Sequence, residues 1–164
     1  MPLLGGARAM AADFVRYEGT AHYTGGLQAL TSGVAFCVPM AMSVQRPSGS
    51  GLSIGTSSRL ILPVGGMWSF TICTRTFGAV GRCIIDLRTM AAGSGAGGTS
   101  VRSVVGVTNT TGINTPDFNI GDIHGTFSAN DYVELFLTSS VASNSLQAGG
   151  VSGETAITAR FVAP

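Results

Sequence analysis

The sequence predicts an all-β fold in which two antiparallel sheets pack face to face as a sandwich. Residues 58–73 are the most informative stretch, because a proline and two glycines there separate a short strand from a longer alternating one. The longer strand opens at Met67 and places Trp68, Phe70 and Ile72 on one face. A large apolar residue at every second position is typical of a strand with one face in a sandwich core.

Two later stretches support the same fold. At 130–137 a turn residue and an acid come directly before alternating apolar positions, and alternation returns in 155–162. The inward residues expected from these patterns are Trp68, Phe70, Ile72, Cys83, Ile85, Leu87, Val133, Leu135, Leu137, Ile157 and Phe161.

Strands are expected in order along the whole chain, each bounded by turn residues. They lie at 13–18, 33–38, 58–63, 67–76, 82–90, 100–107, 117–128, 131–139 and 154–162. Loops rich in Gly and Ser are expected at 45–51, 91–98 and 144–153. No segment has a helical period, so we expect one all-β domain at residues 13–164.

An N-terminal arm is expected at residues 1–12, which are small and apolar with one charge. It is either a disordered terminus or a peg that becomes ordered against a neighbouring subunit. The attachment residues of such a peg would be Pro2, Leu3, Leu4 and Arg8.

Composition narrows the classes of partner. Charged residues make up 10% of the 164 residues and the net charge is +1, so nothing favours nucleic acid or an anionic membrane. No apolar run approaches the length of a membrane span, and the first residues do not form a signal peptide. A surface with so few charges suits burial in an assembly.

Enzyme chemistry is not indicated, and no cofactor or metal is expected. His22 and His124 are far apart and neither has a second ligand at metal spacing. The glycine-rich run at 93–98 lacks the lysine and the following helix of a phosphate loop. Asp131 follows Asn130 at a strand entry, where it is either a turn cap or, with less support, a catalytic acid.

The three cysteines are expected to be reduced. Cys73 and Cys83 flank a hairpin, but Cys73 points away from the core if Trp68 points into it, whereas Cys83 shares a face with Ile85. The two sulfurs should therefore lie on opposite sides of the sheet. Cys37 completes an odd number, so the three cannot all pair internally.

The same stretches, in this order, resemble the C1q/TNF-like superfamily over residues 14–163. The family carries Gly-x-Tyr where its third core strand begins, and here Gly66-Met67-Trp68 stands in that place with tryptophan for tyrosine. It also carries Gly-Asp before the penultimate strand, where this chain has Asn130-Asp131. Asparagine tolerates the left-handed conformation that glycine would supply.

The resemblance implies a jelly-roll sandwich that assembles as a compact homotrimer, with sheets from three subunits facing a threefold axis. From Met67 to Cys73 this strand is uncharged on both faces, as a strand covered on both sides would be. Its outward residues, the expected trimer interface, are Met67, Ser69, Thr71 and Cys73. The alternative is a monomer in which a loop covers this strand.

Modules of this family serve as secreted signalling ligands, collagen-tailed recognition heads and parts of bacteriophage virions. The chain shows no secretory signal, collagenous repeat or coiled-coil stalk. We therefore expect a structural virion protein, made in the host cytoplasm, that decorates a phage shell as a trimer bound to the major capsid protein. The alternative is a minor tail or fibre-tip protein that recognises a host surface polymer. Its candidate exposed aromatics are Tyr132 and Phe136, on the face opposite Leu135.

Overall fold

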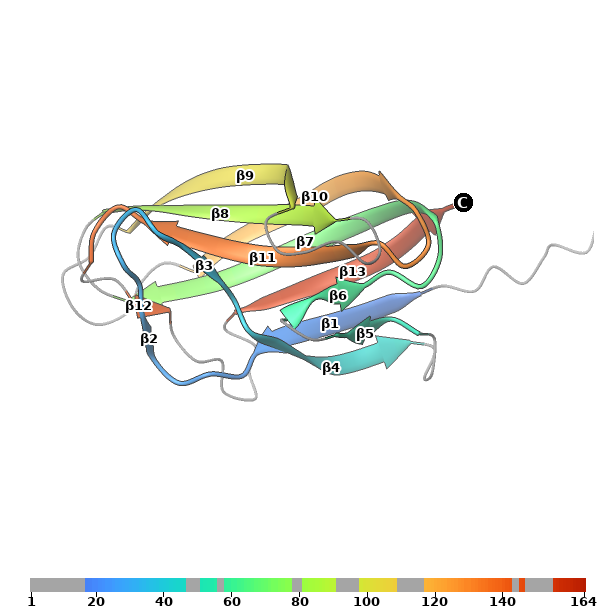
Figure 1. Cartoon of the computed structure of the whole chain (residues 1–164), viewed down its shortest axis with the longest axis horizontal. Coiled ribbons are helices and arrows are strands. Elements are labelled where there is room, and N and C mark those ends of the chain that lie inside the picture. Colours follow the sequence, from blue (N-terminus) through green and yellow to red (C-terminus); the bar gives the residue numbers. More distant parts are fainter. Residues whose placement is uncertain are drawn as a thin grey trace, which may run out of the picture.

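The computed structural model describes residues 17–46, 51–55, 58–77, 81–90, 98–108, 117–142, 145–146 and 155–164. The regular elements in these ranges are β-strands, arranged in two antiparallel sheets that face each other (Figure 1). Within the same ranges, no helix meets the length and apolarity needed to span a membrane. The expected arm at 1–12, with Pro2, Leu3, Leu4 and Arg8, lies outside the described residues.

The first sheet is built around a long central strand. Its main strands, from one edge to the other, are β10 (Asp117–Phe127), β7 (Gly66–Phe77), β13 (Ala156–Ala163), β1 (Glu18–Tyr23) and β4 (Met40–Arg46). Two short strands, β12 (Ser145–Leu146) and β2 (Gln28–Ala29), continue it beside the far end of β7. The last strand of the chain therefore lies inside the sheet, between β7 and the first strand.

The second sheet has β11 at its centre. Its strands, in order, are β9 (Thr99–Thr108), β8 (Gly81–Met90), β11 (Tyr132–Ser139), β6 (Leu60–Ile61) and β5 (Ser53–Ile54). β3 (Ala35–Cys37) pairs with the part of β11 that β6 leaves open. The edges of the two sheets meet where Gln45 Nε2 donates a hydrogen bond to the carbonyl oxygen of Leu52.

The core between the sheets includes the inward residues that the sequence predicted, together with residues of strands and loops for which no inward residue was predicted. Trp68, Phe70 and Ile72 of β7 are buried, as are the predicted inward residues of β8 and β11 and Ile157 of β13. Phe161 is half-buried at the end of the sandwich, where it packs against this core. The apolar alternation thus identified the inward faces of β7, β8, β11 and β13.

The turn before β11 forms as its residues predicted. Asn130 has a φ of 66°, a left-handed conformation in which asparagine is tolerated. Oδ2 of Asp131 accepts a hydrogen bond from the backbone N–H of Ser128 at 2.8 Å. Asp131 is therefore a turn cap, the first of its two predicted roles.

Several strands differ from the prediction. β1 starts at Glu18, where a strand was expected to end. β4 was not expected, and it ends at Arg46, inside an expected loop. The short strands β2, β5 and β12 were not expected either. The inward residues of β1 include Gly19 and Ala21, which carry too little apolar surface to show as alternation. A Cβ on Gly19 would lie 2.4 Å from Cδ2 of Leu52, so close packing requires the small residue there.

The cysteines form no disulfide, as expected. Cys83 is buried in the core and Cys73 lies on the outer side of β7, so the parity argument is correct. Burial raises the pKa of the Cys83 thiol to about 11, which keeps it protonated at neutral pH.

Candidate functional site

The outer face of the first sheet, named here the assembly face, holds the four residues predicted to form a trimer interface. Met67, Ser69, Thr71 and Cys73 alternate with the buried residues of β7 and point away from the core. Met67 is 41% exposed, Thr71 is also exposed, and Ser69 and Cys73 are half-buried. The structure therefore brings all four together on one open surface of the single chain.

Small side chains surround these residues on the neighbouring strands. Thr71 lies opposite Thr158 of β13, which in turn lies opposite Thr20 of β1. The hydroxyls of Thr20 and Thr158 are hydrogen bonded at 2.9 Å. Cys73 lies opposite Ala156. The middle of the assembly face is thus a nearly flat surface of hydroxyl and methyl groups.

One ion pair lies on the assembly face. Nε of Arg160 is 3.1 Å from Oε1 of Glu18, on the β13 and β1 strands beside the threonines. The arginine side chain is half exposed, and an exposed pair of this kind contributes only about 0–1 kcal/mol. The pair neutralises charge on the face more than it stabilises the fold.

The two histidines also lie on this side of the sheet. His124 of β10 is opposite Ser69, and His22 of β1 is opposite Ala156. They stand on different strands, with β7 and β13 between them. Among the described residues, no three His, Cys, Asp or Glu side chains gather as metal ligands.

The outer face of the second sheet contradicts one prediction. Tyr132 and Phe136 were expected to be exposed aromatics on the face opposite Leu135, but they are only 4% and 9% exposed. They do point outward from β11, on the predicted side. Their rings are nevertheless covered, so the expectation of an open recognition surface at these residues is wrong.

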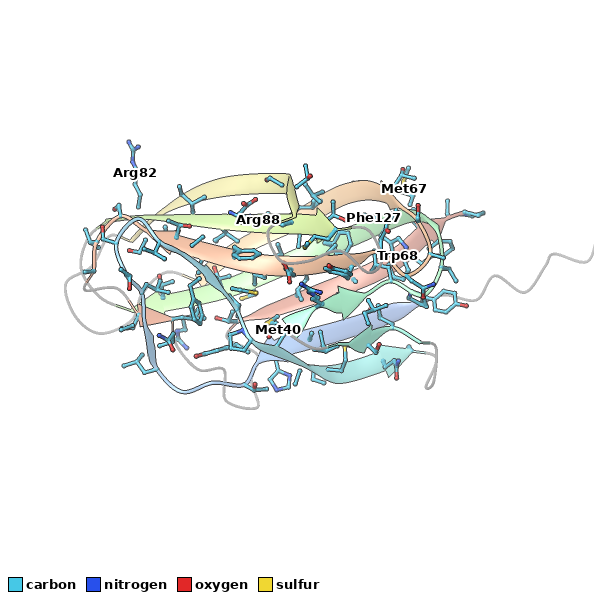
Figure 2. The ribbon with its side chains drawn as sticks, in the orientation of Figure 1. Met40, Met67, Trp68, Arg82, Arg88 and Phe127 are labelled. Atoms are coloured by element: carbon cyan, nitrogen blue, oxygen red, sulfur yellow. The ribbon has the colours of Figure 1, made fainter. Side chains whose placement is uncertain are left out.

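Two arginines cover the rings. The Arg59 guanidinium lies 4.5 Å from the centre of the Tyr132 ring, and that of Arg88 lies 4.2 Å from the Phe136 ring. Figure 2 shows the contrast with Arg82, which projects from the same sheet into solvent. Long arginine stems bury apolar surface while their charged ends stay accessible, so an alternating pattern alone does not reveal such covering.

Glu134 lies between the two aromatic residues on β11 and is the most deeply buried charge in the described part of the chain, 2% exposed. Its Oε1 accepts a hydrogen bond from Nε of Arg59 at 2.9 Å, which raises the pKa of Arg59. Its Oε2 is buried and accepts no hydrogen bond from the described residues. An unsatisfied buried acceptor costs about 1–3 kcal/mol, so this oxygen calls for an explanation.

Cys37 of β3 lies opposite Phe136, at the border of this cluster. Burial raises the pKa of its thiol to about 11, and the Glu134 carboxylate acts in the same direction. The positive charges of Arg59 and Arg88 oppose the shift without cancelling it. The thiol is therefore protonated at neutral pH and is a weak nucleophile.

Sequence reasoning missed Arg59, Arg88 and Glu134. A signal was present, since Glu134 shares an outward face with two aromatic residues and Arg88 belongs to an adjacent long strand with outward charges. This signal could be interpreted only with knowledge that β8 pairs with β11, which places Arg88 opposite Glu134.

Comparison with known proteins supports the fold. No protein-family model matches the chain, and no curated protein matches it. The structure is similar to that of Eiger TNF from S. frugiperda, with a TM-score of 0.59, over 90% of this chain and 93% of that chain, at 9% sequence identity. The chain thus has two antiparallel sheets in a TNF-like jelly roll, as its sequence predicted.

Proposed function

We propose that this chain is a homotrimeric structural protein of a bacteriophage particle, which decorates the outer surface of the shell by binding the major capsid protein. The assembly face would hold the three subunits together. The surfaces directed away from the threefold axis, and the arm at 1–12, would remain available for the shell.

The observation that carries the proposal is the character of the assembly face. The central residues of interfaces are depleted of charge, and β7 and the adjoining half of β13 present Met67, Thr71, Cys73, Thr158 and Ala156 there. Small side chains let backbones of neighbouring subunits approach closely. The ion pair of Arg160 with Glu18 is neutral as a pair, and Arg75, an outward charge of β7, lies beyond Cys73 toward the end of that strand.

The described carboxylates favour a structural role over catalysis. Glu18 pairs with Arg160, and Glu134 pairs with Arg59. Asp131 caps a turn. Asp86 is paired with Arg88. Each of these four acids is therefore held in a structural interaction, which supports a structural role over general acid–base catalysis.

The alternative, a tail or fibre-tip protein that recognises a host polymer, depended on open aromatic rings at Tyr132 and Phe136. Both rings are covered, so no observation favours this alternative over decoration. A trimer that bridges neighbouring capsid subunits needs no such pocket, because three modest contacts act together through avidity.

Electron cryo-microscopy of the intact particle tests the proposal. Density with threefold symmetry on the shell, into which three copies of the sandwich fit with their assembly faces inward, is the expected result. Density at the tail tip alone would support the alternative, and absence of the chain from purified particles would contradict both. A matched test adds the purified chain to shells stripped of it and measures occupancy.

A further inference from the structure

Two carboxylates lie close to Arg88 on the outer face of the second sheet. Glu134 lies directly opposite it across the β8 and β11 pair, and Asp86 lies two residues earlier on its own strand. In the structure Nε of Arg88 donates to Oδ2 of Asp86 at 2.7 Å. The guanidinium therefore turns away from the acid opposite and binds the acid on its own strand.

Glu134, the acid that Arg88 does not bind in the structure, is the one with an unsatisfied oxygen. Oε1 of Glu134 is held by Arg59, whereas Oε2 is buried without a hydrogen bond from any described residue. Directly opposite residues in an antiparallel pair have Cβ atoms about 4.5–5.5 Å apart, and a guanidinium offers five N–H donors. Arg88 is thus within reach of the oxygen that lacks a donor.

Asp86, which Arg88 binds in the structure, accepts a hydrogen bond from a second donor. Oγ of Ser100 on β9 donates to Oδ1 of Asp86 at 2.5 Å. If Arg88 moved to Glu134, Asp86 would keep one charge-assisted hydrogen bond, and Oε2 would gain the bond that it lacks. The exchange trades one strong hydrogen bond for another, which is the condition for two arrangements of similar free energy.

The two arrangements differ in whether Arg88 covers the ring of Phe136. This ring lies opposite Asp86, so the arginine crosses it to reach Asp86 and lies 4.2 Å from its centre. With Arg88 on Glu134, two residues along β11 from Phe136, the ring would be uncovered.

We propose that Arg88 is a two-position switch that covers Phe136 when it binds Asp86 and exposes Phe136 when it binds Glu134. The switch is independent of the assembly face, because it lies on the other sheet. The covering of Phe136 is thus a conformational feature of the second sheet, closed in the present arrangement.

The test uses a Phe136→Trp reporter and acrylamide quenching of its fluorescence. The native Trp68 is fully buried and provides a constant background in every variant. In the reporter chain the variant Asp86→Asn removes the charge that holds Arg88, so quenching should rise severalfold. The variant Glu134→Gln removes the competing charge but keeps an oxygen for Arg59, so quenching should stay low.

The double variant D86N/E134Q decides whether the switch has two positions. We expect low quenching, because Arg88 has no charged acceptor to draw it off the ring. Quenching as high as in D86N would overturn the proposal, since exposure would then not depend on Glu134. Unchanged quenching in D86N would overturn it as well.

A second measurement needs no reporter and no change at Asp86. Exchange between two arrangements should broaden the NMR signal of the Arg88 Nε–H group in the unaltered chain, and E134Q should sharpen it. A sharp signal in the unaltered chain, or broadening that persists in E134Q, would contradict the switch.

Discussion

Phe161 lies directly opposite Trp68 across the β13 and β7 pair, and their rings meet edge to face with centroids 5.4 Å apart. The ring of Tyr17 meets Phe161 edge to face at 6.0 Å. The backbone N–H of Phe161 also donates to the carbonyl oxygen of Tyr17 at 2.9 Å. This aromatic group closes one end of the sandwich and joins its first and last strands.

Truncation of core phenylalanines should follow their burial. Phe70→Ala should lower the free energy of unfolding by about 3–5 kcal/mol, because Phe70 is fully buried and its loss leaves a cavity. Phe161→Ala should cost less, about 2 kcal/mol, because Phe161 is half-buried. Urea denaturation of both variants checks the order, and an equal or larger loss for Phe161→Ala would contradict it.

Arg82 and Arg88 make a matched pair, since both point outward from β8. Arg88→Ala should destabilise the fold by about 1–2 kcal/mol, because it uncovers Phe136 and removes a hydrogen bond to Asp86. Arg82→Ala should change stability by no more than about 0.5 kcal/mol, because the side chain is exposed. Thermal unfolding of the two variants compares them directly. If Arg82→Ala were the more damaging change, the assigned face of β8 would be wrong.

Alkaline pH should destabilise the fold through its buried thiols. Cys37 and Cys83 have pKa values of about 11, whereas a thiol in the unfolded chain ionises at about 8.5. Below about pH 8.5 both states are protonated and stability is unaffected. Above it the unfolded chain releases protons first, so stability falls by up to about 1.4 kcal/mol per pH unit and thiol, until about pH 11.

The variant Cys83→Val serves as the control for this effect. It keeps an apolar side chain of similar size and removes one of the two thiols, so stability should fall less steeply between pH 8.5 and 11. Urea denaturation across that range measures both slopes. Identical slopes for the variant and the unaltered chain would show that other groups, such as tyrosines, cause the loss.

The assembly face predicts a trimer of three times 16.6 kDa in light scattering at micromolar concentration. Thr71→Arg places a charge in the middle of this face and should convert the trimer to a monomer with an unchanged circular dichroism spectrum. Thr99→Arg, at an exposed position of the second sheet, is the matched control and should leave the trimer intact. A monomer of the unaltered chain at high concentration would refute the interface.

The arm is predicted to attach the trimer to the shell. Deletion of residues 2–11 removes Leu3 and Leu4, whose exposure would bring a soluble chain no benefit. The expected result is loss of binding to stripped shells with the trimer preserved in light scattering. Unchanged occupancy would move the attachment role to the glycine-rich segments at 46–51 and 91–98.

The fold was more predictable from the sequence than the site, for physical reasons. Burying a large apolar face leaves a period of two, and this pattern located the inward residues of β7, β8, β11 and β13. The position of β1 was not predicted, because its inward residues include the small Gly19, which packs closely and leaves no apolar alternation in the sequence. The covering of Tyr132 by Arg59 was not predicted because it depends on the pairing of β6 with β11, two strands that lie far apart in the sequence.

The position of β13 has a consequence for how the chain is made. Glu18 in β1 pairs with Arg160 in β13, so the strand that joins β1 to β7 leaves the ribosome after both of them. Until then, both strands present unpaired edges that invite pairing with other chains. Loss of β13 through an early stop codon or cleavage by a protease would split the first sheet and leave those edges open permanently. Synthesis of this protein should therefore depend on chaperones that hold nascent chains, and its contacts between distant residues predict folding in milliseconds to seconds.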